Sequence, residues 1–169
     1  MNFHVYRGKT EYEWETATEH IQQILERTGI ACVQSHPYFY DVNLSSEIRV
    51  EEHEFRVLQA IKASGKLGAG WCAMHPRTSL TTGFRRRASL EDNRRAFSDY
   101  LECAVKYGTG IAAENLAIFV DIDPAKPFFS SNYEDLCDLV DSFADDRMKI
   151  CWDFGHAHLM RFDQPEAIR

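Results

Sequence analysis

The sequence predicts an α/β protein whose strands form a parallel sheet, and three observations support this fold class. Short apolar segments rich in β-prone residues alternate along the chain with longer segments of helical periodicity. Four residues that can bind a metal or transfer a proton, His36, His75, Glu114 and Asp153, each close one of the apolar segments. These four residues follow one another at an equal spacing of 39 positions. A polar residue at the end of every strand of a βα repeat is what an α/β-barrel active site requires.

The composition is that of an ordinary globular protein, and it disfavours several classes of function. With 169 residues, 44% of them hydrophobic and 27% charged, we expect one domain over residues 1–169. A net charge of −7 argues against a nucleic-acid-binding surface. No apolar run is long enough to cross a membrane and the N-terminus lacks a signal-peptide pattern, so we expect a cytoplasmic protein. The five cysteines are odd in number and form no CxxC pair, which argues against a disulfide framework.

The first two helices are marked by capping and glycine signals. Thr10 and Glu13 form a capping box, in which hydroxyl and carboxylate satisfy the amides of a helix start, and Gly29 ends this helix. We expect the second helix at about residues 46–64, with Gly65 as its C-terminal cap.

Two further helices follow a long irregular stretch over residues 78–88. Ser89 with Asp92 opens the third helix and Gly108 ends it, while Asn132 caps the fourth. Apolar residues at helical spacing predict the buried faces of all four helices, which comprise Trp14, Ala17, Ile21, Ile24, Leu25, Phe55, Leu58, Ile61, Phe97, Leu101, Ala104, Val105, Leu136, Leu139, Val140 and Phe143.

The expected strands are short. They cover residues 30–35, 70–74, 111–113 and 150–152, and residues 2–6 alternate like the end of one more strand. Because helices separate the strands, the sheet is expected to be parallel, with right-handed crossovers.

Two architectures share this order of elements, the doubly wound open sheet and the closed eight-stranded barrel. In an open sheet ligands gather at one switch point, whereas in a barrel every strand points its C-terminal end at one mouth. Four polar residues at four consecutive strand ends favour the parallel (β/α) barrel of TIM-barrel type. A complete barrel takes about 250 residues, so we expect an incomplete barrel, the middle half, which the resemblance described below assigns to strands three to six of eight. Its unpaired edges would promote association, and a homo-oligomer is one expected outcome.

The motifs around the strand ends resemble those of the xylose isomerase-like TIM barrel superfamily. The matching pieces are His36 in Gln-Ser-His-Pro, His75 in Met-His-Pro, Glu114 in Glu-Asn, and Asp153 with His156 in Asp-Phe-Gly-His. They run in the family's order over nearly the whole chain. The family contains sugar (phosphate) isomerases and epimerases, inosose dehydratases and apurinic-site endonucleases.

The resemblance implies a metal-dependent sugar (phosphate) isomerase or epimerase, which moves a proton next to a keto-sugar carbonyl through an enediolate. It implies that Glu114 is a metal ligand and an acid/base, that Asp153 is a metal ligand, and that His156 is catalytic and contacts substrate oxygens. His36, His75 and Asn115 would complete the substrate-binding set. Carboxylates with imidazole suit Mn²⁺, Mg²⁺, Co²⁺ or Zn²⁺. The expected partner is a small-molecule sugar or sugar phosphate, with neither nucleic acid nor membrane involved.

Other interpretations remain open at this point. An endonuclease-type phosphodiesterase on the same barrel would use His36 and His75 as metal ligands. By resemblance, two further ligands, one a glutamate, are expected beyond Arg169, so the chain would be a fragment inactive alone, or a non-catalytic one. Taken singly, Glu114 and Asp153 could be carboxylates that cap a helix or pair with an arginine. The basic residues 85–87 could meet a substrate phosphate or form a solvated loop.

Overall fold

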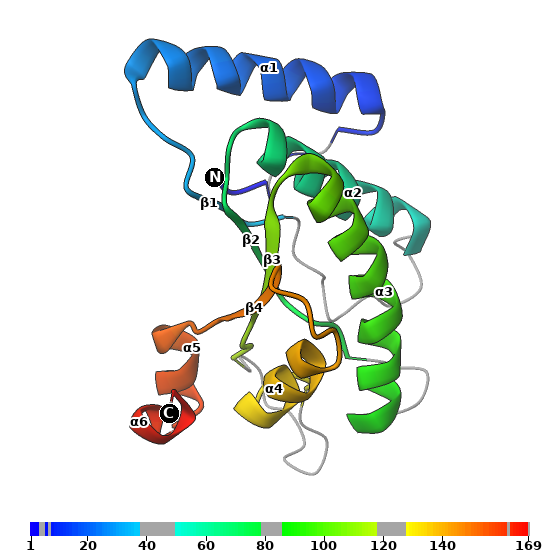
Figure 1. The fold of residues 1–169 in the computed structure, drawn as a ribbon, viewed down its shortest axis with the longest axis vertical. Coiled ribbons are helices and arrows are strands. Elements are labelled where there is room, and N and C mark those ends of the chain that lie inside the picture. Colours follow the sequence, from blue (N-terminus) through cyan, green and yellow to red (C-terminus); the bar gives the residue numbers. More distant parts are fainter. Residues whose placement is uncertain are drawn as a thin grey trace. The chain divides into compact units, whose positions relative to one another are not determined.

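The structure is a computed structural model that describes residues 1–3, 6, 8–37, 50–78, 86–117, 128–161 and 163–168. It divides into two compact units, one made of Met1–Met74 with Asp99–Ile111 and the other of His75–Ser98 with Ala112–Arg169, called unit 1 and unit 2 below. Helices and strands alternate along the chain (Figure 1), in the order α1 (Glu11–Thr28), β1 (Gln34–Ser35), α2 (Val50–Lys66), β2 (Trp71–Met74), α3 (Arg86–Tyr107), β3 (Gly110–Glu114), α4 (Tyr133–Asp141), β4 (Met148–Cys151), α5 (Phe154–Leu159) and α6 (Gln164–Ala167).

The strands form a parallel sheet in sequence order, β1-β2-β3-β4, which confirms the predicted fold class. In unit 1, Gln34 pairs with Trp71 and Ser35 with Cys72. An isolated parallel bridge joins Asn2 to His36 on the other side of β1. Residue 2 therefore pairs as expected of a strand end, whereas His4 and Val5 of the predicted segment 2–6 lie outside the described residues.

The first strand is shorter than predicted. The sequence pattern suggested residues 30–35, but only Gln34 and Ser35 are in β1, and Ile30 and Val33 are 63% and 75% exposed. The partner strand β2 begins at Trp71, directly after Gly70, whose N–H donates to the Val33 carbonyl at 3.1 Å. Regular pairing therefore starts one residue later, at Gln34 opposite Trp71.

Helix α1 begins and ends where the sequence predicts. Both hydrogen bonds of the Thr10–Glu13 capping box are present, and Gly29 adopts the left-handed conformation with φ 68°. Trp14 is buried in the core of unit 1 with Phe3, and its indole N–H donates to the Gly8 carbonyl at 3.1 Å. This contact satisfies the polar end of a buried aromatic ring.

The cap of α2 differs from the prediction, since Gly65 is not the residue that ends the helix. The helix runs through Gly65 to Lys66, and the positive φ of 80° belongs to Gly68. Gly65 meets the chain at Tyr107 instead: a Cβ here would lie 2.7 Å from the Tyr107 Cβ and closer still to the Tyr107 carbonyl oxygen. The residue is a glycine because another backbone approaches it.

The start of α3 also differs from the prediction. The helix begins at Arg86, before the expected Ser89–Asp92 cap, and Ser89 is buried within it. Phe97, Leu101 and Ala104 are buried as predicted, but Val105 is 47% exposed, so its assignment to the buried face was wrong. Gly108, with φ 79°, follows the last helical residue as expected.

Unit 2 contains helix α4, capped at Asn132 as predicted, and strand β4. The Asn132 side chain accepts a hydrogen bond from the Asp135 N–H at 2.9 Å and so caps α4, while Leu136 and Leu139 are buried. Strand β4 covers Met148–Cys151, two residues earlier than the predicted start at residue 150. Among the described residues, no helix has the length and apolar character that crossing a bilayer requires.

We predict that Gly65→Ala destabilises the chain, although alanine normally favours a helix interior over glycine. The added methyl group would collide with backbone and Cβ atoms of Tyr107, and overpacking of this kind costs about 1–3 kcal/mol. The measurement is the free energy of unfolding in urea. Gly70→Ala is the matched control, because its Cβ would lie 3.8 Å from the Val33 carbonyl oxygen, an ordinary contact. Equal stability of the two variants would contradict the packing role.

Candidate metal centre

Three successive strands bring acidic and imidazole side chains to unit 2. All five residues of β3 are buried, and the strand ends in Glu114, which is 7% exposed. His75 directly follows β2, and Asp153 follows β4 after one residue, Trp152. His156 lies on the first turn of α5. The parallel order of the strands is why residues so far apart in sequence end at the same edge of the sheet.

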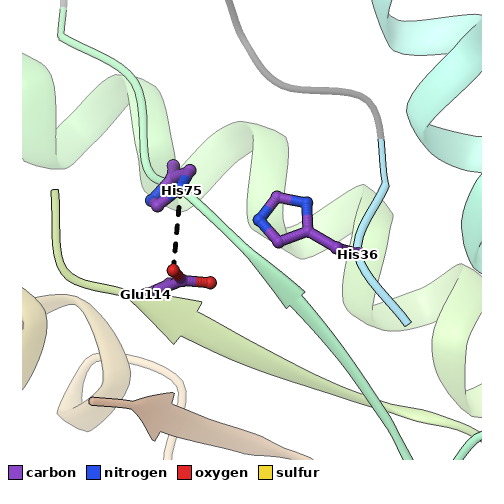
Figure 2. A group of neighbouring side chains, drawn as sticks. All are labelled: His36, His75 and Glu114. Atoms are coloured by element: carbon purple, nitrogen blue, oxygen red, sulfur yellow. Dashed lines mark ion pairs between the residues drawn. The ribbon is translucent and has the colours of Figure 1, made fainter. Parts of the chain in front are cut away.

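The carboxylate of Glu114 lies between two imidazole rings. Its Oε1 is 3.8 Å from His75 Nε2, the ion pair drawn in Figure 2, and 3.7 Å from His156 Nδ1. The two rings lie side by side, with centroids 5.5 Å apart and planes tilted by 45°. Protonation of either ring would place a positive charge against this buried carboxylate.

Asp153 has two distinct carboxylate oxygens. Oδ1 accepts a hydrogen bond from the His156 backbone N–H at 2.7 Å and thereby caps α5. Oδ2 lies 4.0 Å from His156 Nδ1. The capping interpretation and the ligand interpretation of Asp153 are therefore compatible, because each role uses a different oxygen.

The side-chain amide of Asn115 binds the backbone of Asp153. Its Nδ2 donates to the Asp153 carbonyl at 3.0 Å, and its Oδ1 accepts from the Asp153 N–H at 2.6 Å. The main-chain carbonyl of Asn115 lies 2.8 Å from His156 Nδ1. Since a carbonyl can only accept, Nδ1 carries the proton, and in the neutral ring Nε2 keeps the lone pair.

The donor set fits a divalent cation. Glu114, Asp153 and His156 each offer one ligand atom, and these three atoms all lie within 4.8 Å of one another. Two carboxylate oxygens and one imidazole nitrogen suit the divalent ions predicted from sequence, without selecting among them.

Three other histidines, His36, His158 and His4, are not among the three grouped ligands. His36, at the end of β1, belongs to unit 1, where its Nδ1 is 2.9 Å from the Pro37 carbonyl and its N–H donates to the Met1 carbonyl at 2.8 Å. His158 is exposed on α5. His4 falls outside the described residues.

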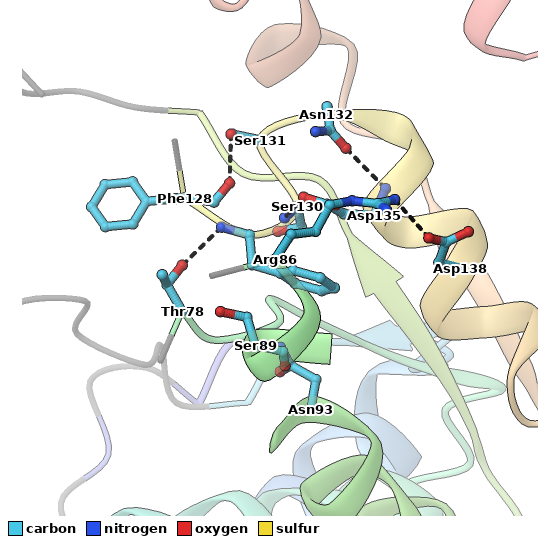
Figure 3. A network of polar contacts seen from close by, with 11 residues as sticks. Thr78, Arg86, Ser89, Asn93, Phe128, Ser130, Ser131, Asn132, Asp135 and Asp138 are labelled. Atoms are coloured by element: carbon cyan, nitrogen blue, oxygen red, sulfur yellow. Dashed lines mark hydrogen bonds and ion pairs between the residues drawn. The ribbon is translucent and has the colours of Figure 1, made fainter. Parts of the chain in front are cut away.

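The basic residues at the start of α3 are engaged by acidic side chains. Arg86 Nε donates to Asp135 at 2.5 Å and its Nη2 to Asp138 at 2.6 Å (Figure 3), while Arg87 pairs with Glu91 at 3.2 Å. Burial raises the pKa of Asp135, and the hydrogen bond from Arg86 opposes that rise. Two of the three arginines that could have met a phosphate thus have partners within unit 2, and Arg85 lies outside the described residues.

Asn93, which binds the segment after His75, was not identified from the sequence. Asn93 is fully buried in α3, and its amide binds both backbone groups of Arg77, two residues after His75. The available signal was an asparagine in a helix interior, where its propensity is poor.

Comparison with known proteins places this chain in a family. The chain matches the family described as "Xylose isomerase-like TIM barrel" over residues 3–169. No curated protein sequence matches it.

Several solved structures share the fold. A D-tagatose 3-epimerase-like protein is 20% identical with a TM-score of 0.66, and the match covers 83% of this chain and 51% of that one. D-psicose 3-epimerase with D-tagatose, from Clostridium cellulolyticum H10, is 15% identical with a TM-score of 0.64, covering 97% and 64%. A putative xylose isomerase from Rhodospirillum rubrum is 14% identical with a TM-score of 0.69, covering 98% and 57%.

At these identities the structural likeness shows the fold alone. The chain spans about half to two thirds of the length of these three structures. The family match, in contrast, extends over nearly every residue, and it agrees with the parallel four-stranded sheet. The chain therefore belongs to the xylose isomerase-like TIM barrel family.

Proposed function

We propose that this chain carries the metal-binding part of a metal-dependent isomerase or epimerase that acts on a keto sugar or its phosphate. The observation that carries the proposal is the grouping of Glu114, Asp153 and His156, whose ligand atoms lie within 4.8 Å of one another. Fold relatives named as epimerases of D-tagatose and D-psicose support the substrate class.

The chemistry of such a reaction suits the residues present. Moving a proton next to a carbonyl requires a base at the carbon and positive charge near the oxygens, and a divalent ion supplies that charge when bound. Glu114, Asp153 and His156 would hold the ion. Glu114, buried at the end of β3, would also take the substrate proton on a carboxylate oxygen and return it.

The imidazoles have complementary roles in this proposal. His156 carries its proton on Nδ1, so Nε2 is the acceptor atom of the neutral ring. His75 Nε2 lies 3.8 Å from Glu114 Oε1, and His75 would donate to substrate oxygens. We also propose His36 as a further substrate contact, on the basis of the family resemblance of its Gln-Ser-His-Pro motif.

We predict that the chain binds Mn²⁺ in a calorimetric titration and that Glu114→Gln weakens the binding by more than about 100-fold. Even residues that only orient a metal ligand contribute 10–100-fold to affinity, so losing a ligand should cost more. Glu91→Gln is the matched control, because Glu91 lies on the surface of α3 and pairs with Arg87. Equal loss in both variants, or none in Glu114→Gln, would contradict the assignment.

Asp153 allows its two roles to be separated. In Asp153→Asn the side chain keeps an acceptor for the His156 N–H and so still caps α5, but it loses the negative charge that attracts a cation. We predict unchanged thermal stability with metal affinity lowered at least about tenfold. Asp153→Ala should lose both, with about 1 kcal/mol of stability gone. If Asp153→Asn binds metal like the wild type, Asp153 acts only as a cap.

The reaction class can be tested in D₂O. The proposed reaction requires metal-dependent incorporation of deuterium at the carbon next to the carbonyl of D-fructose, D-psicose or D-tagatose wherever that sugar is turned over, because proton removal exposes that carbon to solvent exchange. The readout is proton NMR of the recovered sugar, with Glu114→Gln as the inactive variant. Deuterium incorporation that persists in Glu114→Gln would remove the carboxylate from its role as base.

A further inference from the structure

We infer that Asn115 and Asn93 are positioning residues, each of which holds one site-bearing loop by pairing its side-chain amide with both backbone groups of a single residue. Asn115 holds Asp153, and Asn93 holds Arg77 after His75. The inference rests on the proposed metal centre and adds to it the parts that fix its geometry.

The Asn115 contact is a two-point clamp. The residue is fully buried, and its amide satisfies the N–H of Asp153 at 2.6 Å and the carbonyl of Asp153 at 3.0 Å. These two bonds hold the peptide groups on both sides of the Asp153 Cα. The direction of the carboxylate is thereby fixed relative to Glu114, the residue next to Asn115 in the chain.

Asn115 also contacts His156, through its main chain and not its side chain. The Asn115 main-chain carbonyl accepts from His156 Nδ1 at 2.8 Å, which sets the tautomer and the orientation of the ring. One residue thus orients two of the three proposed ligands, and it directly follows the third.

Asn93 repeats the arrangement on another loop. Its Oδ1 accepts from the Arg77 N–H at 2.8 Å, and its Nδ2 donates to the Arg77 carbonyl at 2.7 Å and to the Ser89 carbonyl at 2.8 Å. Both amide hydrogens are used. Only the rigid Pro76 separates Arg77 from His75, so α3 fixes the segment that carries this imidazole.

Both clamps need a donor and an acceptor on one short side chain. Asparagine offers these, whereas aspartate replaces the donor by an oxygen that would face a carbonyl oxygen. Asn132 differs, because it caps α4 through Oδ1, which accepts from the Asp135 N–H at 2.9 Å. The same Asn→Asp exchange should therefore disrupt Asn115 and leave the cap at Asn132 intact.

The test compares Asn115→Asp and Asn115→Ala with Asn132→Asp, by Mn²⁺ calorimetry on the full chain. We expect both Asn115 variants to lose 10–100-fold in affinity, the range for residues that orient metal ligands, and Asn132→Asp to stay within about twofold of wild type, since aspartate caps as well as asparagine. An added negative charge alone would strengthen cation binding, so weaker binding by Asn115→Asp reports a loss of positioning. Wild-type affinity in both Asn115 variants would overturn the inference for Asn115.

Two measurements decide the inference without metal. In the wild-type chain, ¹⁵N shifts should show His156 as the Nδ1–H tautomer, and the Nε2–H tautomer would overturn the role of Asn115. In Asn115→Ala, the Asp153 amide should exchange with solvent faster than in the wild type, and unchanged exchange would overturn the clamp. If the wild-type chain does not bind Mn²⁺, the proposed metal centre fails on its own while these readouts still decide the clamp.

For Asn93→Asp we expect the His75 imidazole resonances to move, with Mn²⁺ affinity kept within about threefold of wild type, because His75 is not one of the three proposed ligands. Unmoved His75 resonances would overturn the role of Asn93.

Discussion

The burial of one carboxylate, that of Glu114, constrains the rest of unit 2. Strand β3 is buried along its whole length, and in a buried position an isolated charge costs several kcal/mol. The polar groups near this carboxylate include two imidazole nitrogens, His156 Nδ1 and His75 Nε2, which lie 3.7 and 3.8 Å from Glu114 Oε1. A cation held by Glu114, Asp153 and His156 would offset the cost of burying the charge, which is why a buried glutamate at a strand end indicates a site more than a structural contact.

The periodic part of this arrangement could be read from the sequence. In a parallel sheet the C-terminal ends of all strands lie at the same edge. Because His75, Glu114 and Asp153 are equally spaced and each follows a predicted strand, the sequence was enough to predict that they lie at one end of the sheet. The helix ends at Thr10, Gly29 and Gly108 were likewise predictable, because capping depends on groups only a few residues apart.

Features that depend on distant contacts were not predictable. In the sequence, Gly65 follows an apolar helical pattern and so resembles a C-terminal cap. A glycine is needed there because the Tyr107 backbone approaches closely, and only the folded chain brings the two residues together. Ser89 and Asp92 have the spacing of a capping box, yet α3 starts earlier, at Arg86, whose side chain is bound by Asp135 and Asp138 (Figure 3). This contact joins residues about 50 positions apart, and a capping pattern read within a few residues does not include it.

Asn115 shows how the structure adds a role that the sequence did not indicate. The resemblance assigned it to the substrate-binding residues through its place next to Glu114 in the chain. In the structure its amide meets the backbone of Asp153, a residue that also caps α5 with one oxygen and leaves the other toward His156. Strand end, helix start and proposed ligand are thus combined in a few residues. Each asparagine clamp ties the segment after one strand to a neighbouring element, Asn115 from the end of β3 and Asn93 from within α3.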